Sequence, residues 1–162
     1  MKRLLVIFSL FFSLICLASP AVAANGAMPG IPGMDDCDSI VLRTSEGWWL
    51  QVYRDGSGSY GFGTDIGRVE AEMGTFVFKE VYEETSKAAA IERKSAEGPY
   101  VAVSYYLPES HSAQEYYMTG GRKYAAGLFR SARENAASPT NDFEERQHKK
   151  IEEFWKKGPF KP

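Results

Sequence analysis

The sequence has few of the residue types on which most catalytic and metal sites depend. It contains two histidines, His111 and His148, and two cysteines, Cys16 and Cys37. A protein zinc ion needs three or four histidine, cysteine or carboxylate ligands in a compact pattern, and these residues are isolated from one another. The sequence therefore predicts no metal and no cofactor, and it favours a protein that is not an enzyme.

Basic residues are not in excess either. The chain has 19 lysines and arginines against 21 aspartates and glutamates, which gives a formal net charge of −2 at pH 7. Nucleic-acid binding depends on a clustered basic face that neutralises phosphates. The charge balance therefore predicts that nucleic acid is not the partner.

One glycine-rich segment, residues 56–61, has the glycine spacing of a dinucleotide-binding loop. In such a loop the glycines open a helix whose N-terminus meets the pyrophosphate. Here the segment lies between two stretches with strand patterning, and no helical pattern follows it. We therefore interpret it as the turn of a β-hairpin.

The N-terminal residues have the pattern of a cleaved export signal. Lys2 and Arg3 precede an apolar run of about fourteen residues, whereas roughly 20 are needed for a permanent membrane span. Small residues at Ala21 and Ala23 suit a signal peptidase. We expect residues 1–23 to be a signal peptide and the mature chain to be exported, either periplasmic or secreted. Cleavage removes two basic residues and shifts the net charge to −4, and no second long apolar run follows that could hold the mature chain in a membrane.

Cleavage after Ala23 leaves Cys37 as the one cysteine of the mature chain. Its thiol is either free or paired with a second chain, and a dimer linked through Cys37 stays open at this point. Three aspartates, Asp35, Asp36 and Asp38, surround it. Their negative charge disfavours a thiolate and makes Cys37 a poor nucleophile.

The mature sequence predicts a flexible leader followed by one folded domain. Residues 24–36 are rich in glycine and proline and lack periodicity, and residues 37–162 alternate between strand and helix patterns. The predicted strands are 39–44, 48–54, 59–63, 68–73, 100–107 and 114–118, and the predicted helices are 75–89, 122–136 and 142–157. Thr75 is the expected N-cap of the first helix. Hairpins followed by helices indicate an α+β domain with an antiparallel sheet of five to six strands and two to three helices.

Aromatic residues are abundant, and they supply the candidate binding residues. Neighbouring aromatics occur within strands, so one ring of each pair points away from the core unless both sheet faces are covered. Exposed tyrosine and tryptophan rings are favoured at protein interfaces and as stacking platforms. The candidate set is Trp48, Trp49, Tyr53, Tyr60, Tyr106 and Tyr116.

The leading hypothesis is an exported, non-catalytic binding protein. In size, acidity and predicted compartment the chain is similar to bacterial periplasmic inhibitors. One version is therefore an inhibitor or immunity-type protein that blocks an enzyme acting on the cell envelope. Acidic loop residues, Asp55, Asp65 and Glu109, would complement a basic partner protein.

Two alternatives remain. A carbohydrate- or peptidoglycan-binding module would stack an envelope glycan on Trp48, Trp49 and Tyr53. An enzyme with an unfamiliar site would use His111 with Ser110 or Ser112, although sequence neighbours rarely have the geometry of a nucleophile and its base.

Overall fold

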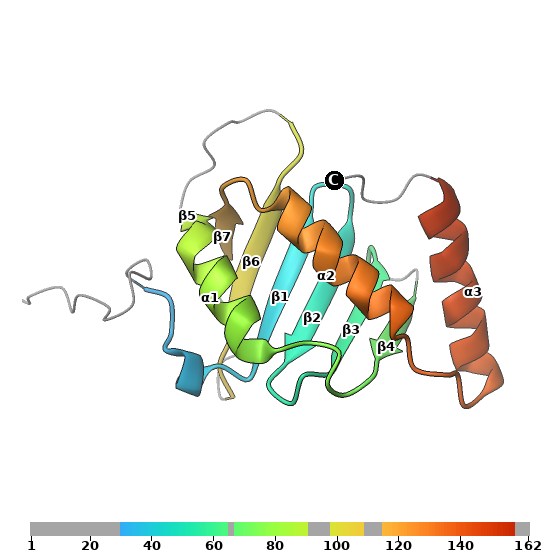
Figure 1. The fold of residues 1–162 in the computed structure, drawn as a ribbon. Coiled ribbons are helices and arrows are strands. Elements are labelled where there is room, and N and C mark those ends of the chain that lie inside the picture. The colour runs from blue at the N-terminus through green and yellow to red at the C-terminus, as the bar shows by residue number, and fades with distance from the viewer. Residues whose placement is uncertain (1–29, 65–66, 91–97, 109–114, 158–162) are drawn as a thin grey trace, which may run out of the picture.

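The chain folds into an antiparallel sheet with two helices on one of its faces and a third helix beside one edge (Figure 1). A computed structural model describes residues 30–64, 67–90, 98–108 and 115–157. In these ranges the strands are β1 (Ser39–Thr44), β2 (Trp48–Tyr53), β3 (Gly58–Phe62), β4 (Arg68–Ala71), β5 (Ala89–Ala90), β6 (Val101–Tyr106) and β7 (Glu115–Met118). The α-helices are α1 (Phe78–Ala88), α2 (Arg122–Glu134) and α3 (Asp142–Lys157), and a short 3₁₀ helix spans Met34–Asp36.

The seven strands of the described residues lie in the order β4-β3-β2-β1-β6-β7-β5. Strands β1 to β4 form an antiparallel meander. Strand β6 pairs with β1 on the side opposite β2. The glycine-rich segment 56–61 contributes its first two residues to the turn between β2 and β3 and continues into β3 from Gly58, which gives the predicted hairpin. Gly56 adopts a φ of +80° there, and a Cβ at this position would meet the carbonyl oxygen of Phe76 at 2.5 Å.

The predicted fold class is confirmed: the chain is a small α+β domain with an antiparallel sheet and three α-helices. Strand β5 was not predicted, because two alanines carry no alternating pattern. The N-cap prediction for Thr75 is wrong. The helix begins at Phe78 with Val77 in the cap position, and the Thr75 hydroxyl instead donates to the carbonyl oxygen of Glu72 at 2.6 Å.

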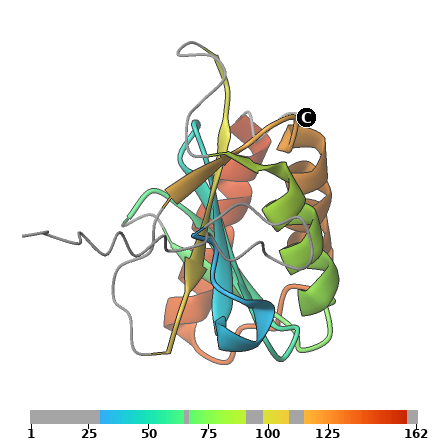
Figure 2. The same cartoon turned by 90° about the vertical axis from the view of Figure 1, so that its left-hand side faces the viewer.

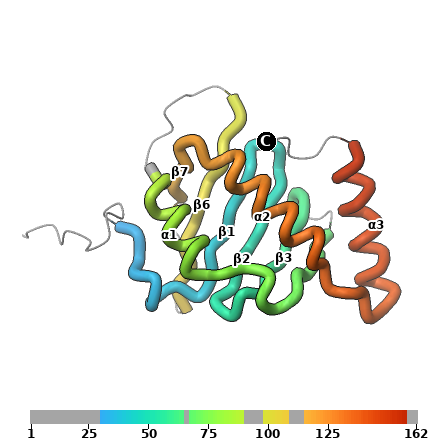
Figure 3. Tube along the Cα trace, in the orientation of Figure 1, coloured from blue at the N-terminus to red at the C-terminus, as the bar shows by residue number. Residues whose placement is uncertain are grey.

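The core lies between the sheet and helices α1 and α2, which Figure 2 shows on the same side of the sheet. Alternation along β2 sends Trp48, Leu50 and Val52 into this layer, where each is almost completely buried. Helix α2 passes diagonally over the central strands (Figure 3), and its Phe129 meets the Trp48 ring edge-on, with 6.4 Å between centroids. We call this side of the sheet the helix face.

The outer edge of β4 is paired rather than open. The connection between α2 and α3 runs beside it, and Ala136 forms an isolated antiparallel bridge with Ala71. The amide of Glu72 donates to the carbonyl of Asn135 at 2.9 Å, and the amide of Ala137 donates to the carbonyl of Glu70 at 2.8 Å. The connection thus satisfies backbone groups that an edge strand would otherwise expose.

The expected leader boundary at residue 36 needs a correction. Ile31 and Met34 pack against the core, and the carbonyl oxygen of Pro32 accepts a hydrogen bond of 2.7 Å from the Tyr82 hydroxyl. Arg54 donates to the carbonyl of Met34, also at 2.7 Å. Residues from Gly30 onward therefore belong to the folded unit. The prediction failed because a glycine- and proline-rich segment can still contribute apolar side chains and carbonyl acceptors to a core.

In the described part of the chain, no helix is both long enough and apolar enough to cross a membrane. The predicted signal peptide and residues 24–29 lie outside the described residues.

Candidate functional site

The sheet face opposite the helix face carries no helix of the described residues across its centre, and we call it the open face (Figure 2). Its members follow from the strand register, because residues directly opposite each other in a sheet share a face. They are Ser39, Val41, Arg43, Trp49, Gln51, Tyr53, Ser59, Gly61, Arg68, Glu70, Ala102, Ser104, Tyr106, Glu115 and Tyr117.

Large and small side chains are distributed unevenly over the open face. Strand β3 contributes only Ser59 and Gly61 to it, and β6 contributes small residues except for Tyr106 at its end, whereas β2 contributes Trp49, Gln51 and Tyr53. The Trp49 ring lies across Gly61 of β3, where a Cβ would come within 2.6 Å of Trp49 Cζ2. Its indole Nε1 donates to the carbonyl oxygen of Gly63 at 3.0 Å. Trp49 is therefore held against the sheet by packing and by a hydrogen bond.

Tyr53 and Arg68 are joined above β3. The Tyr53 hydroxyl lies 3.4 Å from the Ser59 hydroxyl and accepts a hydrogen bond of 3.0 Å from Arg68 Nη2. Arg68 Nε also donates to Glu70 Oε1 at 2.6 Å. Burial opposes the guanidinium charge, but the hydrogen bonds to Glu70 and Tyr53 outweigh it, so the pKa of Arg68 is raised. Arg68 is consequently a fixed cation with its charge balanced by Glu70.

The other end of the open face is also built from aromatic and paired charged residues. Tyr117 meets Tyr100 edge-on, with 5.6 Å between ring centroids. Arg43 and Glu115 form an exposed ion pair at 3.9 Å. Tyr106 is half-buried at the end of β6. Exposed pairs of this kind contribute little stability, so their main effect here is to keep this end of the face close to neutral.

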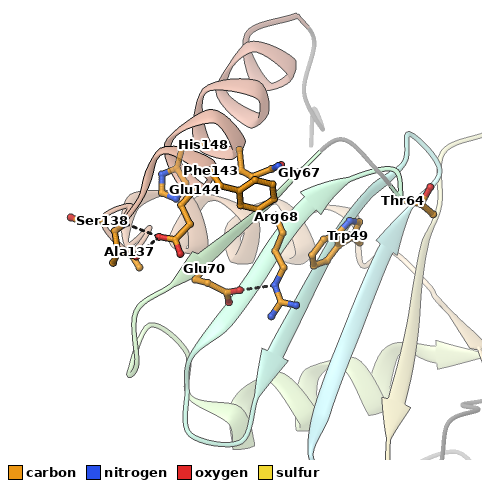
Figure 4. Close-up of a pocket in the computed structure, with 12 residues that line it drawn as sticks. Trp49, Thr64, Gly67, Arg68, Glu70, Ala137, Ser138, Phe143, Glu144 and His148 are labelled. Atoms are coloured by element: carbon orange, nitrogen blue, oxygen red, sulfur yellow. Dashed lines mark hydrogen bonds and ion pairs between the residues drawn. The ribbon is translucent and has the colours of Figure 1, made fainter.

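A groove of about 710 Å³ opens where the open face meets α3 (Figure 4). The sheet supplies Trp49, Arg68 and Glu70, and α3 supplies Phe143 among its lining residues. The complete lining is Trp49, Thr64, Gly67, Arg68, Glu70, Ala137, Ser138, Thr140, Phe143, Glu144, Gln147 and His148. Figure 4 shows Arg68 lying between Trp49 on one side and the first turns of α3 on the other.

The start of α3 is fixed by side-chain capping, which sets the wall of the groove. Asn141 Oδ1 accepts hydrogen bonds from the amides of Phe143 and Glu144, each at 3.0 Å. Glu144 in turn accepts from the amide and hydroxyl of Thr140, at 2.6 and 2.9 Å. These hydrogen bonds, led by the one from the Thr140 amide, lower the pKa of Glu144. The arrangement resembles a capping box and keeps the first turn of α3 in place.

Helix α3 crosses the β4 edge of the sheet. Its C-terminal half contacts helix-face residues: Phe154 stacks on Phe62 with 4.8 Å between centroids, and Trp155 meets Trp48 edge-on at 5.1 Å. Its N-terminal half borders the open face. One polar atom is buried at this crossing: Gln147 Oε1 lies against Gly67 and has no hydrogen-bond donor among the described residues.

The structure divides the six sequence-predicted binding residues into two groups. Trp49, Tyr53 and Tyr106 belong to the open face. Trp48, Tyr60 and Tyr116 are core residues of the helix face with at most 2 % of their surface exposed. Burial raises the pKa of the Tyr60 hydroxyl to about 12. These three buried rings cannot stack on a ligand, and we remove them from the candidate site.

Sequence reasoning missed most of the groove. Arg68 and Glu70 alternate with apolar residues, as is typical of a strand with one polar face, but nothing in the sequence places them beside α3. The helical pattern of residues 142–157 predicts an apolar stripe that includes Phe143, Ile151 and Phe154, whereas 62 % of the surface of Phe143 is exposed. One feature of the sequence could have indicated that Phe143 is exposed: it stands eight positions from Ile151, the next residue of that stripe.

Cys37 does not support the dimer hypothesis. Its side chain is 1 % exposed, so a disulfide to a second chain would require the domain to open. Burial, reinforced by Asp36, raises the pKa of the thiol to about 11, which keeps it protonated. His111, Ser110, Ser112, Asp65 and Glu109 lie outside the described residues. Within those residues, no group of three or more histidine, cysteine or acidic side chains is placed to hold a metal ion.

Comparisons with known proteins leave the site to be interpreted from its own geometry. No protein-family model matches the sequence. No curated protein and no solved structure matches the chain.

Proposed function

We propose that the chain is an exported binding protein that recognises a partner protein through the open face of its sheet. The observation that carries the proposal is the placement of the described helices. Both α1 and α2 cover the helix face, which leaves the half-buried rings of Trp49, Tyr53, Tyr106 and Tyr117 on the other side.

The contacts of these rings support recognition by a preformed surface. Trp49 is held by Gly61 and Gly63, and Tyr53 is held by Ser59 and Arg68. Ordering a side chain on binding costs about 0.5–1.5 kcal/mol, and side chains that are already ordered avoid most of that cost. Tyrosine and tryptophan rings also bring large contact areas with few rotatable bonds.

The charge distribution supports a partner that is bound mainly by shape and aromatic contact at the centre of the face. Arg43 pairs with Glu115 and Arg68 pairs with Glu70, so the open face itself is balanced. Within this proposal, the version we favour is inhibition of an exported enzyme by covering its active site. It requires no chemistry from the binding protein.

The test uses a photoreactive benzoylphenylalanine introduced at position 106 or 117 of the open face. Position 83, an exposed site of α1 behind the helix face, is the matched control. We expect a crosslinked partner from envelope or secreted fractions at positions 106 and 117 but not at 83. The purified partner should then bind the Tyr106→Ala variant at least tenfold more weakly, while circular dichroism shows an unchanged fold. Equal crosslinking from both faces, or no crosslink from the open face, would refute the proposal.

A further inference from the structure

We infer that the groove between the open face and α3 is a binding site for an uncharged saccharide segment. This inference rests on the proposed function only in that both require the open face to stay uncovered. The groove shares Trp49 with the surface of the proposed function but contains neither Tyr106 nor Tyr117, the two positions tested there, so the two proposals can fail independently.

The first argument comes from the exposed rings. The Trp49 ring packs against Gly61 and also lines the groove. Phe143 lies on the opposite wall with 62 % of its surface exposed. A phenyl group exposed to this degree adds little to the core. Two aromatic surfaces facing one groove are suited to the apolar faces of a ligand ring.

The second argument comes from the polar groups around these rings. The Arg68 guanidinium and the Glu70 carboxylate are joined at 2.6 Å and stand at the groove, each with about half of its side-chain surface exposed. Together they offer planar donors and acceptors side by side, which is the pattern that vicinal hydroxyl groups can match. Gln147 also lines the groove, although its Oε1 is buried against Gly67, where it meets no hydrogen-bond donor among the described residues.

The third argument is the charge of the lining, which carries both signs and therefore disfavours a charged ligand of either sign. Arg68 is compensated by Glu70, and Glu144 is engaged by Thr140. His148, one turn after Glu144 on α3, is the remaining titratable group of the lining. An anionic ligand would meet Glu70 and Glu144, and a cationic one would meet Arg68. The volume of about 710 Å³ falls within the range of small-molecule sites.

The test is a nuclear magnetic resonance titration of the domain with two neutral probes, an N-acetylglucosamine trimer and maltotriose. A galacturonate trimer and a proline-rich decapeptide are the comparison ligands. We expect saturable shifts of the Trp49 indole N–H with at least one neutral probe, and binding at least tenfold weaker for the galacturonate trimer. No binding of either neutral probe, or tighter binding of the charged trimer or the peptide, would overturn the inference.

Variants locate the site. Phe143→Ala and Glu70→Gln change exposed side chains, so we expect both to fold and to weaken saccharide binding at least tenfold. Val77→Ala is the matched control, because Val77 is 57 % exposed but lies outside the groove. Tyr106→Ala should also leave saccharide binding unchanged, since Tyr106 does not line the groove and β6 is four strand spacings, about 19 Å, from β4 and two, about 10 Å, from the strand of Trp49. If Phe143→Ala and Glu70→Gln bind the saccharide as the unmodified chain does, the groove is not the site.

Discussion

At the scale of single residues, the open face depends on glycine and serine as much as on its rings. Ser59 and Gly61 on β3 leave room for Trp49 and Tyr53 of β2 to lie over them. A ring that rests on a neighbouring strand covers backbone and loses little further freedom when a partner arrives. The small residues thus determine how the large ones are presented.

We expect Gly61→Ala to destabilise the domain by about 1–3 kcal/mol, the usual cost of forcing a methyl group into occupied space. Its Cβ would collide with the carbonyl oxygen of Gly67 and come within 2.6 Å of the Trp49 ring. Urea unfolding followed by circular dichroism measures the change.

Gly127→Ala is the matched control, because Gly127 lies inside α2 with open space around it. There the same methyl group should stabilise the domain by about 0.5–1 kcal/mol, since glycine is a poor helix former. Equal effects at the two positions would contradict the packing we describe for Trp49.

At the scale of elements, the sequence predicted what depends on local pattern and missed what depends on tertiary contact. Strand β1 and helix α3 have the predicted bounds, because β-branched residues, hydrophobic period and flanking charges all act locally. The start of α1 was predicted three residues early, since a threonine before an apolar stripe is a good local cap signal but Thr75 bonds elsewhere. Strand β5 depends on its pairing with β7, which no local sequence pattern predicts.

The candidate site was predicted in part, for a related reason. Alternation places Trp48 and Trp49 on opposite faces, but when both faces carry aromatic residues, alternation alone does not reveal which face the helices will cover. The packing of Phe129 on Trp48 decides it. Arg68 and Phe143 are far apart in sequence, and only the crossing of α3 over the β4 edge brings them to one groove.

Helix α3 should behave as an integral part of the domain rather than as an appendage. Ile151 is fully buried at its centre, and Arg133 of α2 makes two hydrogen bonds of 2.8 Å to Glu152. We expect Ile151→Ala to lower the free energy of unfolding by about 2–5 kcal/mol, as other large-to-small core changes do.

Phe143→Ala, eight residues earlier on the same helix, should change the free energy of unfolding by no more than about 0.5 kcal/mol, because its ring is exposed. Chemical denaturation of both variants tests this contrast. A single transition that shifts only for Ile151→Ala supports the packing, and a separate early transition for α3 would count against it.

At the scale of the whole molecule, the pKa values of the Cys37 thiol and of several tyrosine hydroxyls shift in the same direction. Burial raises the pKa of Cys37 to about 11, that of Tyr60 and Tyr124 each to about 12, and that of Tyr105 further still. Each group stays protonated in the folded domain at a pH where the unfolded chain has already released its proton. Folding therefore becomes less favourable as the solution becomes alkaline.

Part of this pH dependence of stability can be assigned to one group, the Cys37 thiol. The Cys37 thiol has an ordinary pKa of 9.0, so its contribution to stability is complete below pH 9 and is lost as the pH rises toward 11. We expect the urea midpoint of the unmodified chain to fall more steeply between pH 9 and 11 than that of Cys37→Ala. Urea midpoints measured at pH 8, 9, 10 and 11 check this. If the midpoints of the two proteins fall in parallel with pH, burial does not raise the pKa of Cys37.

The pairing of β4 with the α2–α3 connection limits how copies of this protein can associate. A sheet grows into fibrils when the outer strand of one molecule accepts a strand from the next. Here Asn135 and Ala137 already occupy backbone groups along β4, so this edge offers an incoming chain a poor template. The protein can therefore expose an aromatic sheet face at high local concentration with less risk of polymerising through that edge.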